Sequence, residues 1–122
     1  KSTRPKWRPS DKLVVYKCLF RWYHTHNLVA WDEVLERCWK ALGEGTSKAV
    51  LERRLVSLVK GGGVRDGQDA ASDCELLVAA LRACDGTLLV MGDVRDELKR
   101  LLVGRTWTSV HAFSRRTLGL QN

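Results

Sequence analysis

Two stretches of this chain, sixty residues apart, follow the same pattern. Residues 46–50, Thr-Ser-Lys-Ala-Val, correspond to residues 106–110, Thr-Trp-Thr-Ser-Val, and Val34, Leu42 and Leu58 each have an identical residue sixty positions later. An internal repeat constrains the architecture before any single residue does, because two copies of one unit are expected to fold alike. The alternative is a coincidence of two helical hairpins.

Each copy reads as an apolar helix, a short glycine-containing turn opened by Thr, and a second helix with paired arginines. A tight turn between two helices, the second of them polar and basic, is the helix-turn-helix plan. The repeat therefore predicts two helix-turn-helix units in one chain.

Apolar residues at helical spacing predict six helices, at about residues 11–24, 32–42, 47–60, 73–84, 91–102 and 106–118. No segment alternates strictly enough to predict a strand. The expected caps are Ser10 or Asp11 for the first helix, Thr46 or Ser47 for the third, Asp73 for the fourth and Thr106 or Thr108 for the sixth.

These elements predict an all-α fold of two three-helix units, packed together or linked in tandem. The boundaries that we expect are a basic N-terminal arm at residues 1–8, a first repeat at 9–60, a glycine-rich linker at 61–72 and a second repeat at 73–122. The chain begins without Met and without a signal-peptide pattern, so we expect it to be excised from a longer protein.

The positive charge lies in the first half of the chain. Residues 1–60 hold thirteen Lys and Arg against six Asp and Glu, whereas residues 61–122 hold eight of each, so the whole excess of +7 precedes the linker. One-sided charge of this sign is typical of a protein that meets a phosphate backbone on one face. The alternative interpretation is a domain whose surface is basic without a nucleic-acid partner.

The four cysteines, Cys18, Cys38, Cys74 and Cys84, all fall in apolar helical patterns. None forms a C-x-x-C pair and no His stands at ligand spacing from a Cys pair, so we expect buried reduced thiols, a reducing compartment and no metal. The chain has neither a phosphate loop nor a nucleophile motif, so we expect no enzymatic activity, no cofactor and no small-molecule substrate. No apolar run approaches the ~20 residues of a membrane span.

The first copy resembles the Myb/SANT family of three-helix repeats. The matching residues are Trp7 with Asp11, the segments 31–34 (Trp-Asp-Glu-Val), 42–43 (Leu-Gly) and 46–50, and the arginine pair 53–54. The second copy resembles a degenerate relative, in which residues 104–106 (Gly-Arg-Thr), Val110 and the arginine pair 115–116 match the turn and third helix. It departs from the family because Met91 stands in place of its second Trp and no Trp opens the copy.

The resemblance implies a non-enzymatic nuclear module of chromatin, telomere or transcription-regulating type, whose third helices enter the major groove of double-stranded DNA. Carried over onto this sequence, the DNA-binding residues would be Arg4, Lys6, Arg8, Lys48, Arg53, Arg54, Arg105, Thr108, His111, Arg115 and Arg116. The third helix of the first copy, however, has neither Asn nor Gln, the side chains that usually read adenine. For Lys48 the alternative is a solvated face in which it pairs with Glu52.

The alternative function is that of a SANT-like module which binds other chromatin proteins or a second copy of itself. The third helix of the first copy has more apolar residues than one buried face needs, and the second half of the chain is neutral. The residues expected at such a protein interface are Trp22, Leu51, Leu55 and Val59.

Overall fold

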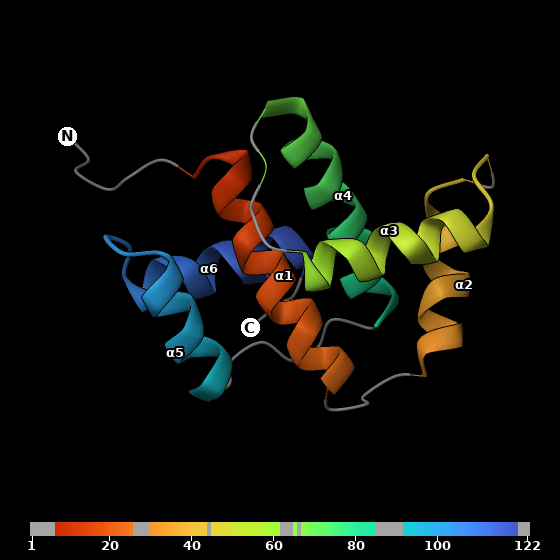
Figure 1. Cartoon of the computed structure of the whole chain (residues 1–122). Helices are drawn as coiled ribbons and strands as arrows, with labels where there is room; N and C mark the ends of the chain where they lie inside the picture. The colour runs from red at the N-terminus through yellow and green to blue at the C-terminus, as the bar shows by residue number, and fades with distance from the viewer. Residues whose placement is uncertain are drawn as a thin grey trace.

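The computed structural model describes residues 7–25, 30–43, 45–61, 65, 67–84 and 92–119. These residues form six helices and no strand, which confirms the all-α prediction (Figure 1). The helices are α1 (Pro9–Thr25), α2 (Trp31–Ala41), α3 (Lys48–Lys60), α4 (Gly67–Ala83), α5 (Gly92–Leu101) and α6 (Trp107–Leu118).

The helices of the two halves repeat at nearly the spacing of the sequence repeat. α4, α5 and α6 begin 58, 61 and 59 residues after α1, α2 and α3 respectively. The identical residues are buried in both copies at two repeat positions, Val34 with Val94 and Leu58 with Leu118. At these positions the sequence repeat is therefore also a repeat of core positions.

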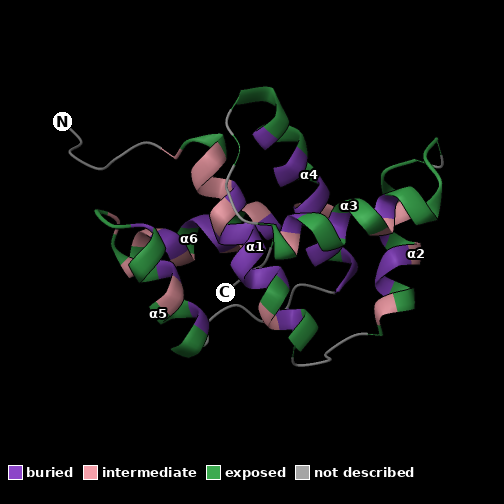
Figure 2. Ribbon diagram, viewed as in Figure 1, coloured by how far each residue is buried: buried purple, intermediate pink, exposed green. Residues whose placement is uncertain are grey.

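The two halves share one core. α1 packs most extensively against α4, and each of these first helices packs against the second helix of the other half: α1 against α5, and α4 against α2. α1 is accordingly central in Figure 1, and the buried residues of Figure 2 converge on α1 and α4. All the buried apolar residues, from Leu13 in α1 to Leu118 in α6, belong to one cluster.

α4 begins earlier than we expected. Residues 67–71, assigned from the sequence to the linker, form its first turn and a half, and Ala70 is fully buried. Asp73, expected to cap the helix, lies inside it and is fully buried. The prediction was wrong because Asp73 is held by arginines from outside its own helix, a contact that local sequence does not reveal.

The start of α1 also differs from the prediction. Pro9 occupies the first helical position, where its missing N–H has no partner to lose. The amide of Lys12 donates to the carbonyl of Arg8, so Arg8, rather than Ser10 or Asp11, is the cap position. Asp11 instead lies at the third helical position and accepts from the backbone N–H of Arg8, which is one half of a capping box.

Candidate nucleic-acid interface

The connections from α2 to α3 and from α5 to α6 each contain a left-handed glycine followed by a hydroxyl cap. Gly43 has a φ of 87° and Gly104 a φ of 94°, a left-handed conformation that glycine adopts without steric cost. Ser47 then caps α3 by accepting from the amide of Val50, and Thr106 caps α6 by accepting from the amide of Ser109. Both cap predictions are confirmed, with one of the two candidates chosen in each case.

α3 is held against α2 by Trp31. The indole Nε1 of Trp31 donates to a carboxylate oxygen of Glu52 at 2.7 Å, while its ring contacts Phe20 and His24 at the end of α1. Leu51 and Leu55 point into the core. The exposed face of α3 is therefore formed by Lys48, Ala49, Val50, Arg53, Arg54, Val56, Ser57 and Lys60.

Two of the three predicted cations of α3 are engaged within the protein. Lys48 forms an ion pair with Glu36 of α2 and lies over the ring of Trp39, so the alternative pairing with Glu52 is not present. Arg54 donates from Nη2 to Oδ1 of the buried Asp73 at 2.9 Å.

Arg53 is exposed, and within the described residues it has no ion-pair or hydrogen-bond partner. On α3, Arg53 is therefore the predicted cation whose side chain is not engaged by another described residue.

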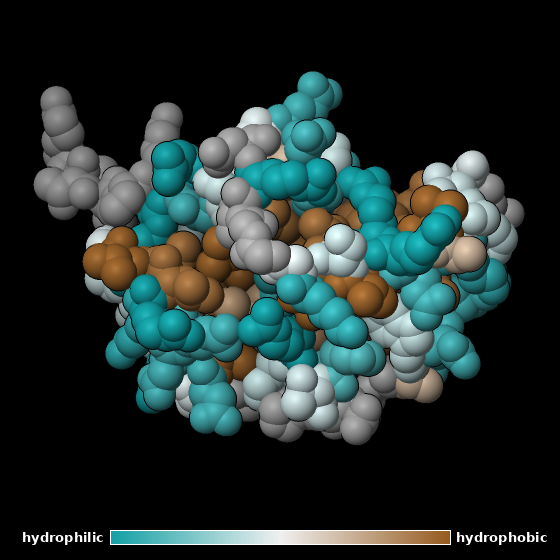
Figure 3. All heavy atoms as spheres, viewed as in Figure 1, coloured by the Kyte–Doolittle hydropathy of each residue, from teal (hydrophilic) through white to brown (hydrophobic). Residues whose placement is uncertain are grey.

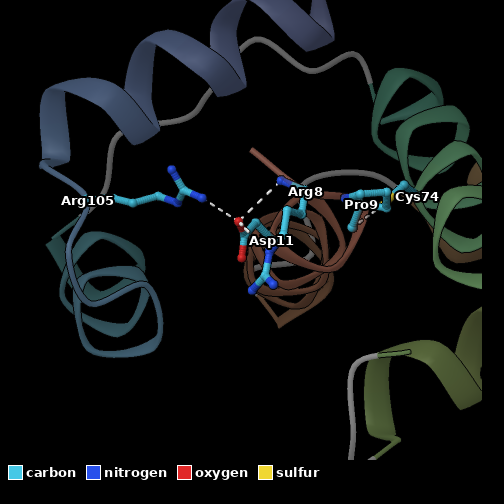
Figure 4. A network of polar contacts seen from close by, with 5 residues as sticks. All are labelled: Arg8, Pro9, Asp11, Cys74 and Arg105. Atoms are coloured by element: carbon cyan, nitrogen blue, oxygen red, sulfur yellow. Dashed lines mark hydrogen bonds and ion pairs between the residues drawn. The ribbon is translucent and has the colours of Figure 1, made fainter. Parts of the chain in front are cut away.

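Arg105 is held away from the surface by polar contacts with residues at the start of α1 (Figure 4). Its side chain is 7% exposed, forms an ion pair with Asp11 and lies 4.2 Å above the ring of Trp7. Trp7 in turn stacks on Phe113 of α6 at 4.4 Å. Arg105, which we predicted to bind DNA, is therefore buried, and its guanidinium joins the α5–α6 turn to α1.

The N-terminal arm is described only in part. Arg8 has a side chain that is 74% exposed, with its Nε 3.8 Å from a carboxylate oxygen of Asp11, so it can reach a ligand from the surface. Arg4 and Lys6 lie outside the described residues.

α6 presents a small polar face. Thr108 and Arg116 are exposed, and neither has a described partner for its side chain. His111 stacks on Trp107 and has a buried Nε2, and burial, followed by the charge of Arg115, lowers the pKa of its imidazole. Arg115 is half-buried, with a buried Nη2. Thr108 and Arg116 are the predicted residues of α6 that point to solvent.

The structure buries two of the four residues predicted at a protein interface. Leu51 is 6% exposed and Leu55 is fully buried, while Val59 and Trp22 are half-buried. The ring of Trp22 packs edge-on against Tyr23. Leu51, Leu55 and Val59 were predicted at the surface because α3 has more apolar residues than a three-helix core needs, but the shared core of six helices buries more of α3.

Sequence reasoning missed the carboxylates that hold the basic side chains. Asp73 binds Arg54 and Arg65, and Asp11 binds Arg105. The sequence does carry a signal at Asp73, which lies within an apolar helical stripe where a carboxylate is rare unless it is paired.

The four cysteines are buried and free, as expected, and burial raises the pKa of Cys18 to about 12 and that of the other three to about 11. In the described part of the chain no His, Cys, Asp or Glu residues gather in a set that could hold a metal ion. Among the same residues, no helix is both long and apolar enough to cross a membrane.

The exposed basic residues Arg53 and Arg116 lie on helices that Figure 1 shows on different sides of α1.

Comparison of this chain with models of protein families, with curated proteins and with solved structures finds no match.

Proposed function

We propose that this chain is a non-enzymatic nuclear module that binds double-stranded DNA through α3, α6 and the basic N-terminal arm. The observation that supports the proposal best is the repeated turn. In both halves a left-handed glycine and then a hydroxyl cap precede a helix with exposed cationic side chains, although the glycines are 61 residues apart and the caps 59, so neither pair falls exactly on the sixty-residue register. In this proposal the halves are divergent Myb-like units that share one core.

Phosphate contacts supply most of the affinity in this proposal. Among the described residues, the cations available without loss of an internal ion pair include Arg53 and Lys60 on α3 and Arg116 on α6. The proposal adds the arm residues Arg4, Lys6 and Arg8, of which Arg8 has a side chain that is 74% exposed. Each neutralised phosphate adds about −0.9 to the slope of log K against log salt, so we expect a slope on the order of −3 to −5. This slope is shallower than eleven contacts would give, because Lys48, Arg54 and Arg105 are engaged inside the protein. In addition, Arg115 is half-buried, Thr108 is uncharged and the pKa of His111 is lowered.

The test is fluorescence anisotropy of a labelled duplex titrated with the full chain at ~50 mM salt, where phosphate contacts are little screened. The test variant is Arg53→Gln with Arg116→Gln. The matched control is Arg95→Gln with Lys99→Gln, which removes the same charge from the exposed face of α5.

We expect the test variant to bind at least about tenfold more weakly than the control variant. Equal weakening by both pairs would show that net charge alone attracts DNA. An absence of binding by the unaltered chain would remove the proposal.

A second function, SANT-like protein binding, is favoured by one difference between the halves. Leu42 is 46% exposed and Val50 is 40% exposed, whereas their repeat partners Leu102 and Val110 are buried. The two exposed residues line a cavity of about 410 Å³ between the α2–α3 turn and α4. Figure 3 shows apolar surface among the hydrophilic side chains at this end of α3.

Sedimentation of the full chain and of Leu42→Ser with Val50→Ser separates the two functions. Self-association that the double substitution abolishes, without binding of DNA by the unaltered chain, would favour protein binding. A monomer that binds DNA equally well with either sequence would exclude it.

A further inference from the structure

Two arginines from different parts of the chain bind one buried carboxylate, and a lysine of α1 lines the same cavity. Asp73 of α4 is fully buried, and its Oδ1 and Oδ2 accept from Arg54 of α3 and from Arg65, which precedes α4. Lys17 of α1 lies at the same place, 9% exposed, with its Nζ 3.2 Å from the carbonyl oxygen of Gly61.

The residues of this cluster carry more positive charge than negative charge. Among the described residues that line it, Lys17, Arg54 and Arg65 carry three positive charges and Asp73 carries one negative charge, which leaves an excess of two. Buried charges are normally paired, because desolvation of an unpaired ion is costly. Lys17 shows this cost, since burial, with the charge of Arg21 second, lowers the pKa of its ammonium group.

The excess charge faces an open space. A cavity of about 360 Å³ lies between α1, α3 and the start of α4, and its lining also includes the Ser57 hydroxyl side chain and the backbone of Gly61. The side chains of Arg54 and Arg65 are 52% and 54% exposed, so two of the residues that line the cavity are also in contact with solvent.

The two guanidinium groups retain donors. Each has five N–H donors, and its contact with Asp73 uses Nη2, which leaves Nη1 and Nε for a second acceptor. The planar guanidinium of arginine can donate to two oxygens of a tetrahedral anion at once, and the Lys17 ammonium can donate to another oxygen. Asp73 does not repel such an anion strongly, because each of its oxygens is covered by one guanidinium.

We propose that this cavity is a binding site for a phosphate group, held by Lys17, Arg54 and Arg65. The site does not depend on the proposed function. The phosphate can belong to a free anion or to a nucleic-acid backbone, and both sources present the same oxygens to the same donors.

The test is isothermal titration of the full chain with pyrophosphate at low salt. We expect saturable binding with a Kd below about 1 mM. Arg65→Gln and Lys17→Met should each weaken it by at least about tenfold. The matched control is Arg53→Gln, which removes an exposed charge beside Arg54 that does not line the cavity and should leave the Kd unchanged.

Folding is checked by thermal unfolding of each variant. Pyrophosphate should raise the Tm of the unaltered chain by mass action and should have less effect on Arg65→Gln. If Lys17→Met does not fold, Arg65→Gln alone tests the site. This variant is expected to fold, because Arg65 is half-exposed and Asp73 still has its ion pair with Arg54. An absence of binding at ~10 mM pyrophosphate, or equal weakening by Arg53→Gln, would overturn the site.

Duplex DNA separates the two sources. Competition between pyrophosphate and duplex, with weaker duplex binding by Arg65→Gln, would place a backbone phosphate in the cavity. If Arg65→Gln weakens the binding of pyrophosphate but leaves the binding of duplex DNA unchanged, the ligand is a free anion. Both results support the site. Pyrophosphate binding by a chain that does not bind DNA would refute the proposed function and leave the site intact.

Discussion

The ion pair between Asp11 and Arg105 joins the first and last parts of the fold, and its two partners are not equivalent. Arg105 is 7% exposed and Asp11 is 13% exposed. Asp11→Ala leaves a buried guanidinium without its carboxylate, which typically costs about 3–5 kcal/mol. It also removes the acceptor for the Arg8 amide, a contact of about 0.5–2 kcal/mol in helix caps. The Trp7 ring, 4.2 Å from the guanidinium, compensates by up to about 2 kcal/mol.

Arg105→Met should cost less, about 1–3 kcal/mol, because Met retains the apolar stem and Asp11 keeps the Arg8 N–H. The midpoints of the three contributions add to about 4 kcal/mol for Asp11→Ala, which should lower the Tm by roughly 10–25 °C. Urea and thermal unfolding followed by circular dichroism measure both variants. The reasoning would be refuted if Arg105→Met were the more damaging change, or if neither variant cost more than about 1 kcal/mol.

Three further results are expected. Gly104→Ala should destabilise the fold by about 1–2 kcal/mol because its φ is 94°, whereas Gly45→Ala, with open space around it and no such φ, should be neutral in urea unfolding; equal effects would contradict this. The pKa of His111 is lowered in the folded state, so as the pH falls the unfolded chain binds the proton first, and the free energy of unfolding should decrease below about pH 6.5. His111→Gln should reduce this pH dependence in urea unfolding at pH 5–7; an unchanged dependence would contradict its assignment to His111. A fragment of residues 7–61 should show little helical circular dichroism, because α1 and α2 lose α4; cooperative unfolding of this fragment would contradict a shared core.

The six helices and both turn caps were predictable because their causes are local. The spacing of residues such as Val34, Leu35 and Cys38 marks one face of α2, and the turn before α3 is marked by Gly43 and Ser47. The identity of the partner helix is not local. An apolar stripe on α1 reads the same whether it packs against α2 or α5, so the exchange of second helices between the halves could not be predicted.

The ion pairs could not be predicted from the sequence either, because their partners are also far apart along the chain. Arg105 and Asp11 are 94 residues apart, and Arg54 and Asp73 are 19 residues apart on different helices. Basic residues were therefore assigned to DNA by type alone. The fold decides which of them remain free, and it leaves Arg53 exposed while Arg54, the next residue, is paired.

The salt dependence of duplex binding tests the central claim most directly. The unaltered chain and Arg53→Gln with Arg116→Gln are compared by anisotropy between ~50 and ~200 mM salt. The account predicts a steep linear fall of log K, with a slope about 2 units shallower in the variant, one for each lost phosphate contact. Absence of binding at the lowest salt, or a slope that the double substitution leaves unchanged, would contradict the assignment of α3 and α6 to DNA.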